Sequence, residues 1–173
     1  AGVDVHEGMA RVIDGHHVEV EGERYSSRYI LVAVGGWPSL PEIEGKEWMS
    51  SSNEIFGLAE RPERIAIIGG GYIALEFAGI FHGLGSKVHV LYRGDTVLRG
   101  FDQDVRSHLQ DELKARGMDV RTQASPSKIE RVGGALRVSL SDGNLLDVDH
   151  VLAATGRVPR TAGLGLEQAG VEL

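Results

Sequence analysis

The chain has 173 residues, of which 42% are hydrophobic and 25% charged, as is usual for a globular protein. Its 18 Lys and Arg against 25 Asp and Glu give a formal net charge of −7, which argues against nucleic acid as a partner because such binding needs clustered cations. The absence of cysteine excludes disulfide scaffolds, Cys-ligated zinc, iron–sulfur clusters and any thiol chemistry carried by this chain. We also expect no signal peptide, because residues 1–20 carry charges and have no apolar core, and no membrane span, because the longest apolar stretch, residues 65–81, is broken by glycines and by Glu76.

The N-terminal third predicts short strands. Apolar and polar residues alternate over residues 3–25, with turns at Asp14-Gly15 and Glu21-Gly22. Residues 29–36, YILVAVGG, form a continuous apolar run that is typical of a strand covered on both faces. Residues 37–62 are rich in proline, glycine and serine, and we interpret them as a linker with one helical turn where the chain passes between domains.

From Arg64 onward the pattern becomes regular. The sequence predicts a buried strand over 64–69, an apolar helix over 72–84, a second strand over 86–92 and an amphipathic helix over 102–117 with an apolar stripe at Val105, Leu109 and Leu113. Shorter strands should follow over 118–122, 127–132 and 135–141, with a last apolar strand over 145–156. This order predicts an α/β fold, a Rossmann-like parallel sheet with crossover helices plus a β-meander.

A glycine-rich motif lies at the first strand-to-helix turn. It fits G-x-G-x-x-A and consists of Gly69, Gly70, Gly71, Tyr72, Ile73 and Ala74. Gly69 permits the tight turn, Gly71 has no Cβ and so lets a pyrophosphate approach the backbone, and Ala74 allows close packing of helix on strand. The free N–H groups of the helix N-terminus then favour phosphate. The motif predicts dinucleotide binding; the alternative is a tight turn without a ligand.

The end of the second strand predicts which dinucleotide is bound. A site for NAD usually has Asp or Glu there to accept a hydrogen bond from the ribose 2′-hydroxyl. Here Tyr92 and Arg93 occupy the strand end, Arg99 follows on the same loop, and Asp95 is the nearest carboxylate. Two guanidinium groups suit a 2′-phosphate, so the sequence favours NADPH, unless both arginines are simply solvated surface residues.

With these residues in view, the sequence resembles the glutathione reductases within the flavoprotein disulfide reductases. Residues 69–90 resemble the NADPH motif and its helix in that family, and residues 92–102 resemble the segment that carries its two 2′-phosphate arginines. Residues 30–45 resemble the point where such chains leave the FAD domain, and 151–160 resemble the A-T-G-R-x-P-N segment where they return to it. The paired arginines separate the sequence from the lipoamide dehydrogenases, which have an acidic residue at the strand end.

The resemblance implies a domain arrangement. Residues 1–37 and 157–173 would be remnants of a split FAD-binding domain, 38–62 the crossing linker and 63–156 the NADPH-binding domain. Because the chain opens at Ala1 and its first methionine is Met9, we expect it to be part of a longer protein. Trp37 and Arg160 depart from the family, which commonly has Arg and Asn at these positions.

The resemblance also implies roles for individual residues. Gly69, Gly71 and Ala74 would hold the pyrophosphate, with Arg93 and Arg99 on the 2′-phosphate. Tyr72 and Glu76 would lie on the nicotinamide and flavin side, where they are our catalytic candidates. Gly156 would approach the flavin.

The parent enzyme implied by the resemblance passes hydride from NADPH to FAD, and electrons on to a disulfide and then to glutathione disulfide. The resemblance also implies that this parent enzyme is a homodimer in the cytoplasm. The redox Cys pair, the catalytic His and the interface domain are missing here, so we predict that these 173 residues alone are inactive.

Three other readings stay open. The chain could be a non-catalytic NADPH-binding module, the corresponding segment of another disulfide reductase such as lipoamide dehydrogenase, or a complete small dehydrogenase. The seven histidines do not have the spacing of metal ligands, so we predict no metal site.

Overall fold

A computed structural model describes residues 2–173 and divides the chain into two compact units. The larger unit is Pro38–Val158; the smaller one combines the residues up to Trp37 with Pro159–Leu173. Two short strands, β4 (Gly36–Pro38) and β13 (Arg157–Pro159), pair with each other where the chain passes from one unit to the other. Within residues 2–173, no helix is long and apolar enough to cross a membrane.

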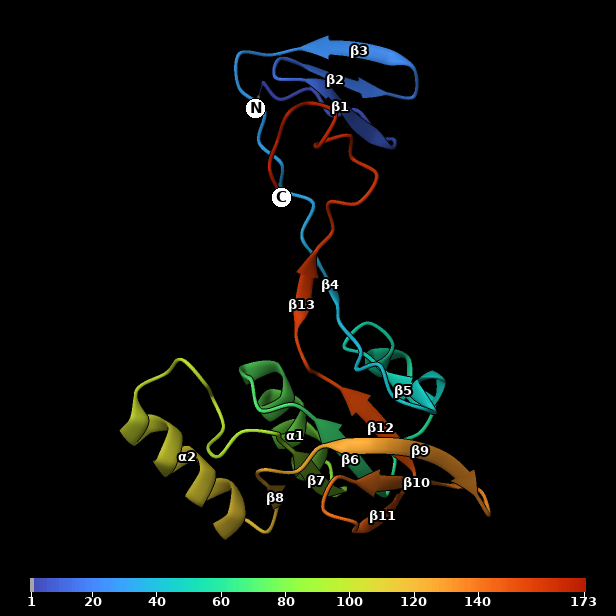
Figure 1. Ribbon diagram of the computed structural model, residues 1–173, viewed down its shortest axis with the longest axis vertical. Coiled ribbons are helices and arrows are strands. Elements are labelled where there is room, and N and C mark those ends of the chain that lie inside the picture. Colours follow the sequence, from blue (N-terminus) through green and yellow to red (C-terminus); the bar gives the residue numbers. More distant parts are fainter. Residues whose placement is uncertain (1) are drawn as a thin grey trace. The chain divides into compact units, whose positions relative to one another are not determined.

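The larger unit is built on a parallel sheet of five strands (Figure 1). The strand order across the sheet is β5 (Met49–Ser50), β12 (His150–Ala153), β6 (Arg64–Ile68), β7 (Lys87–Leu91) and β8 (Asp119–Arg121), and each strand pairs in parallel with the next. Apart from His89 on β7, the buried residues of the central strands β6, β7 and β12 are apolar on both faces, as expected of strands covered from both sides. The predicted Rossmann-like α/β fold is therefore confirmed, with β5 as an edge strand that the sequence did not indicate.

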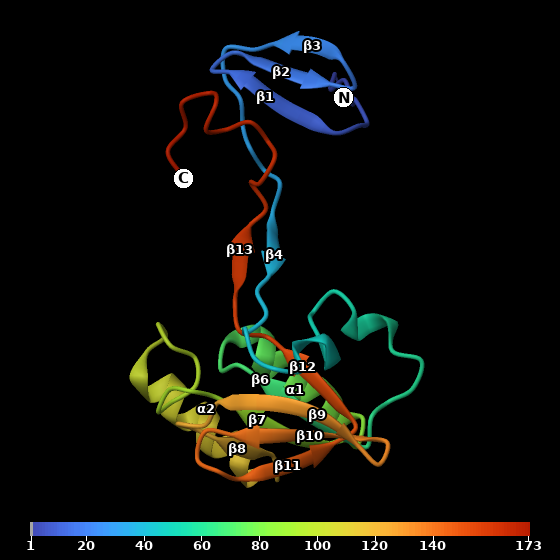
Figure 2. The ribbon, with the colours of Figure 1, turned by 45° about the vertical axis from the view of Figure 1, so that its right-hand side comes forward.

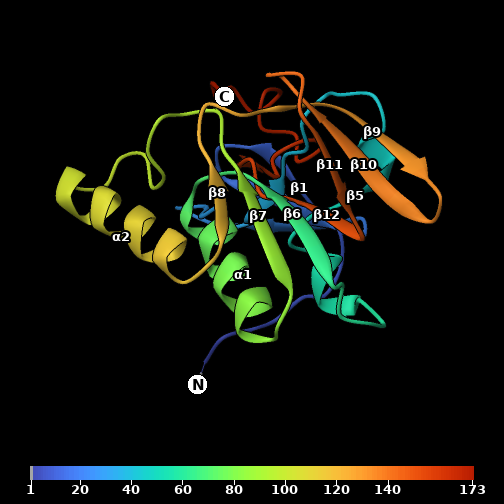
Figure 3. The ribbon, with the colours of Figure 1, turned by 90° about the horizontal axis from the view of Figure 1, so that it is seen from below.

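Two helices cover one face of this sheet (Figure 3). Helix α1 (Tyr72–Gly83) links β6 to β7, and α2 (Gln103–Ala115) lies between β7 and β8. The side chain of Asp102 caps α2 by accepting a hydrogen bond from the Asp104 N–H at 2.9 Å. The apolar stripe predicted on α2 is correct only in part, because Val105 is 51% exposed.

An antiparallel meander covers the opposite face. It consists of β9 (Pro126–Val132), β10 (Ala135–Leu140) and β11 (Leu145–Val148), which lie side by side in Figure 2. Successive residues of β10 alternate between half-buried and buried positions, and the buried ones are Leu136, Val138 and Leu140, as a strand with one covered face requires. The single strand expected over 145–156 is wrong: β11 pairs with β10, whereas β12 pairs with β6 in the other sheet.

Asp149 separates these two strands. Its carboxylate accepts hydrogen bonds from the backbone N–H, Nε and Nη2 of Arg64. Arg64 lowers the pKa of Asp149 through these bonds. The ion pair therefore fixes the point where the chain leaves the meander and enters the parallel sheet.

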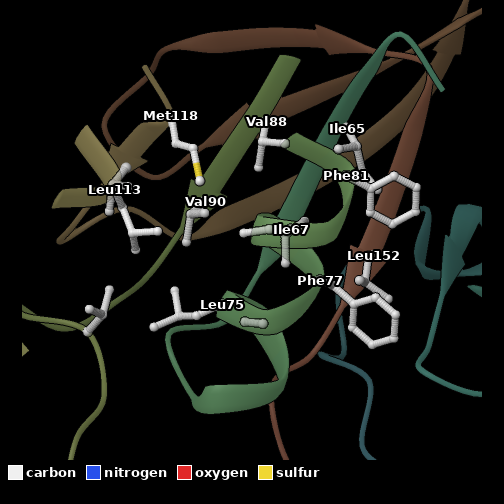
Figure 4. Packing of buried hydrophobic residues seen from close by; sticks show 14 of the residues in the cluster. Ile65, Ile67, Leu75, Phe77, Phe81, Val88, Val90, Leu113, Met118 and Leu152 are labelled. Atoms are coloured by element: carbon white, nitrogen blue, oxygen red, sulfur yellow. The ribbon is translucent and has the colours of Figure 1, made fainter. Parts of the chain in front are cut away.

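Two apolar cores result, one on each face of the sheet. Alternate residues of β6 divide between them, with Ile65 and Ile67 toward the helices and Ala66 and Ile68 toward the meander. Figure 4 shows the helical side, where the aromatic rings of Phe77 and Phe81 lie near Leu152 and Ile65. Burial of these side chains stabilises the sheet and holds the carboxyl ends of its strands in place.

Two 3₁₀ turns lie in the segment that the sequence suggested as a linker. They are η1 (Lys46–Trp48) and η2 (Ile55–Gly57), on either side of β5. Met49 and Ile55 of this segment are buried in the larger unit.

The smaller unit contains an antiparallel sheet of β1 (Ala10–Asp14), β2 (His17–Val20) and β3 (Glu23–Ser26), as the alternation predicts. The strand predicted over 29–36 is wrong: residues 29–35 form none, and Leu31 is 90% exposed. A buried strand needs partner strands and a covering layer on each face, and no strand within residues 2–173 pairs with residues 29–35. The two departures from the family pattern lie against each other, with the Arg160 guanidinium 4.8 Å above the Trp37 ring.

His150 makes the stability of the fold depend on pH. Its Nε2 is buried and has no hydrogen-bond partner among the described residues, and burial lowers the pKa of the imidazole. The unfolded chain therefore takes up a proton near pH 6.5, before the folded chain does, so stability is full above that pH and falls below it. We expect His150→Leu to reduce the loss of stability between pH 7.5 and 5.5, as measured by urea unfolding. An equal loss in both proteins would contradict this assignment.

Candidate functional site

A groove of about 640 Å³ lies at the carboxyl ends of the parallel strands. The last residues of β6, β7 and β12, which are Ile68, Leu91 and Ala153, line its floor. After β6 the chain passes through α1 to β7 on one side of β6. Strand β12, which follows the meander in the sequence, pairs with the other side of β6. Open α/β sheets bind ligands at such a switch in strand order.

The glycine loop forms one wall of the groove, and its three glycines serve different needs. Gly69 has φ of +136°, and a Cβ there would collide with the carbonyl oxygen of Ala154. A Cβ on Gly70 would lie 2.5 Å from the ring of Tyr92. A Cβ on Gly71 would meet no atom within 4 Å, so only this glycine faces open space. The space above Gly71 suits a group that must approach the backbone closely.

Helix α1 begins directly after Gly71, which has no side chain to cap it. The first backbone bond of the helix runs from the Leu75 N–H to the Gly71 carbonyl at 3.2 Å. The N–H groups of Tyr72, Ile73 and Ala74 precede that bond, at the positive end of the helix dipole. Tyr72 and Ile73 line the groove, and Ala74 is fully buried against the strand.

A loop after β7 forms a second wall and carries the two arginines. Arg93 and Arg99 are both exposed and both line the groove. The backbone between them turns at Leu98, which is buried, has φ of +53° and donates its N–H to the Gly70 carbonyl at 2.6 Å. This bond joins the arginine loop directly to the glycine loop. The two predicted elements of the site therefore form one structure.

The remaining candidates occupy different places. Tyr72 is 57% exposed at the rim of the groove, and Gly156 lines it with φ of +147°. The Gly156 carbonyl accepts the N–H of Ser39 at 2.9 Å. Glu76 is exposed one turn after Tyr72 on α1 and is not among the described residues that line the groove.

Several groove residues were not predicted. The segment after β8 contributes Ala124, Ser125 and Pro126, and the segment after β4 contributes Ser39 and Leu40. The Thr155 hydroxyl donates to the Ser39 carbonyl at 2.6 Å, which fixes this second segment beside β12. These residues belong to no motif; their only signal is their position just after strands that end at the groove.

Three polar side chains of β7 and β8 are linked to one another. His89 is buried on β7, and its Nδ1 lies 2.7 Å from the carboxylate of Asp119 on β8, which also accepts from Arg121. Burial raises the pKa of Asp119, but hydrogen bonds from Arg121 and His89 outweigh it and hold the pKa below its usual range. Across residues 2–173, no three His, Asp or Glu side chains are arranged to hold a metal ion.

Comparison with known proteins identifies relatives over the whole chain. The pyridine nucleotide-disulphide oxidoreductase family model matches residues 1–173. Glutathione reductase of Burkholderia cepacia is 50% identical over 173 residues, all of this chain and 38% of that protein. Trypanothione reductase of Trypanosoma congolense is 45% identical over 155 residues, 87% of this chain and 32% of that protein.

A solved structure has the same fold. The HOCl-induced flavoprotein disulfide reductase RclA from Escherichia coli superposes with a TM-score of 0.87 and 32% identity, over 98% of this chain and 40% of that one. The chain thus spans well under half the length of the relatives that it matches. The resemblance to glutathione reductases is confirmed, and the chain belongs to the pyridine nucleotide-disulphide oxidoreductase family.

Proposed function

We propose that this chain is the NADPH-binding portion of a flavin disulfide reductase of the glutathione reductase type. One observation carries the proposal: a single groove has an open glycine backbone on one wall and two exposed arginines on the other. The strand end between them holds Tyr92 and no carboxylate.

The groove residues fit the nucleotide by chemistry. The open backbone at Gly71 leaves room for a pyrophosphate to approach closely, and the free N–H groups at the start of α1 can donate hydrogen bonds to its negatively charged oxygens. Arg93 and Arg99 supply forked donors for a 2′-phosphate. NADPH, when bound, supplies a hydride. We assign Tyr72 and Glu76 to the nicotinamide side, with Gly156 beside the flavin of the longer protein.

The later steps of the reaction require groups from outside this sequence. The chain has no cysteine, so no thiolate of its own can form a mixed disulfide. We therefore propose that the full-length protein binds FAD, carries the redox disulfide and reduces glutathione disulfide, as a homodimer in the cytoplasm. The similarity to both glutathione and trypanothione reductases supports a glutathione-based disulfide as the substrate class. The 173 residues alone should show no turnover of glutathione disulfide.

A titration of the purified chain with NADPH and then NADH, in buffer free of phosphate, tests the nucleotide assignment. We expect tighter binding of NADPH, by about 100-fold, because two charge-assisted hydrogen-bond partners are added. Equal or tighter binding of NADH would overturn the assignment and favour the lipoamide dehydrogenase branch.

A further inference from the structure

We propose that Arg106 is a positioning residue that holds the arginine loop in place, and that it thereby sets the preference for a phosphorylated nucleotide. The proposal rests on the proposed function, since it concerns the same groove. Arg106 belongs to no motif that the sequence presents, and it is not among the described residues that line the groove.

The guanidinium of Arg106 spans two successive carbonyls of the loop. From its place on α2, its Nε donates to the Val97 carbonyl at 2.9 Å and its Nη2 to the Thr96 carbonyl at 2.7 Å. Its Nη1 donates to Oε1 of Gln103, one turn earlier on the helix, at 2.9 Å. The side chain is only 16% exposed. All three nitrogens are therefore engaged within the protein, which is the pattern of a structural fork and not of a ligand contact.

The loop needs such a fork because it has no regular structure of its own. Between β7 and α2 no helix or strand orders the backbone, and the αL turn at Leu98 is unfavourable for a residue other than glycine. A second contact from α2 adds to the fork, because Oε1 of Gln110 accepts the Val97 N–H at 3.3 Å. Arg106 and Gln110 thus tie the two residues before Leu98 to the helix.

The geometry explains how a residue outside the groove controls what binds in it. The tied residues lie between Arg93 and Arg99, and the loop is joined to the glycine loop only one residue later, through Leu98. The backbone on both sides of Arg93 is held separately, because Ala124 donates its N–H to the Tyr92 carbonyl and Gln123 donates its N–H to the Gly94 carbonyl. Release of Thr96 and Val97 therefore leaves Arg99 to be ordered when the ligand binds, and that ordering weakens the binding of the 2′-phosphate. A ligand without this phosphate makes no use of the two arginines and should be unaffected.

The test compares Arg106→Lys and Arg106→Gln with the wild-type chain, using NADPH and NADH as probes. Lysine keeps the charge but cannot donate along two fixed directions, so both variants should lose about tenfold in NADPH affinity while NADH affinity stays within twofold. Arg116→Gln is the matched control, because Arg116 lies at the other end of α2, where its side chain is 71% exposed and forms a surface ion pair with Glu112. Urea unfolding of each variant establishes that the compared proteins are folded.

The outcomes separate this proposal from the proposed function. If Arg106→Lys preferred NADPH over NADH as strongly as the wild-type chain does, the role of Arg106 would be overturned. An equal loss of affinity for NADPH and NADH in the Arg106 variants would overturn it as well. A wild-type chain with no preference for NADPH would overturn the proposed function instead. In that case amide hydrogen exchange still decides the loop contact: exchange at Val97 and Leu98 should be faster in Arg106→Gln than in Arg116→Gln, and equal rates would overturn it.

Discussion

Replacing Gly71 with glutamate should lower the affinity for NADPH by at least about 100-fold while leaving the fold as stable as before. Gly71 has φ of −82°, which any residue adopts, and its Cβ would point into open space. The new carboxylate would occupy the place proposed for the pyrophosphate and would repel it. A 100-fold loss of affinity corresponds to roughly 2.7 kcal/mol of binding free energy. Nucleotide titration and urea unfolding of the same preparation measure the two quantities.

Two further glycines provide the controls for this experiment. Gly79→Glu introduces the same charge on the exposed side of α1, where a Cβ also meets nothing within 4 Å, and it should leave binding unchanged. Gly69→Ala should do the opposite of Gly71→Glu and destabilise the fold by roughly 2 kcal/mol or more, because φ is positive and the Ala154 carbonyl is in the way. Retention of NADPH affinity in a folded Gly71→Glu protein would contradict the assignment of the pyrophosphate.

The larger unit was predictable because its elements depend on local pattern. β6, α1 and β7 follow in order from a continuous apolar run, a glycine turn and an apolar helix, and the structure has all three. The errors arose where tertiary pairing decides. Residues 29–35 read as a buried strand but have no partner strand in residues 2–173, and residues 145–156 read as one strand but divide at Asp149 between two sheets.

The difference between features set by local sequence and features set by tertiary contacts also holds within the site. The glycine motif and the two arginines are visible in sequence because each position has a chemical requirement of its own. The contacts that join them are not visible in this way. Gly70 needs to be glycine because of the Tyr92 ring more than twenty residues later, and the loop is held by Leu98 and Arg106 through backbone carbonyls that any residue supplies. Sequence reasoning therefore identifies the groups proposed to contact the nucleotide better than the groups that position them.

The double variant Arg93→Ala/Arg99→Ala should abolish the preference for NADPH. Each charge-assisted hydrogen bond contributes about 1.5–3 kcal/mol, so the loss of one such bond from each arginine should lower the affinity for NADPH by at least about 100-fold. NADH has no 2′-phosphate, and its affinity should stay within about twofold. Both side chains are exposed and neither is part of the core, so the melting temperature should not change. Parallel titrations with both nucleotides at constant ionic strength give the ratio directly.

Salt dependence distinguishes a specific phosphate site from a general effect of charge. The double variant raises the net negative charge of an already acidic chain, which alone would weaken any anionic nucleotide. Arg116→Ala combined with Lys114→Ala removes the same number of positive charges from exposed positions at the far end of α2 and should affect NADPH and NADH equally and slightly. If this control reduced the NADPH preference as much as Arg93→Ala/Arg99→Ala does, the two arginines would be acting only through the overall field. A loss confined to Arg93→Ala/Arg99→Ala, and persisting at high salt, places the 2′-phosphate on their guanidinium groups, because closely paired charges are screened less than distant ones.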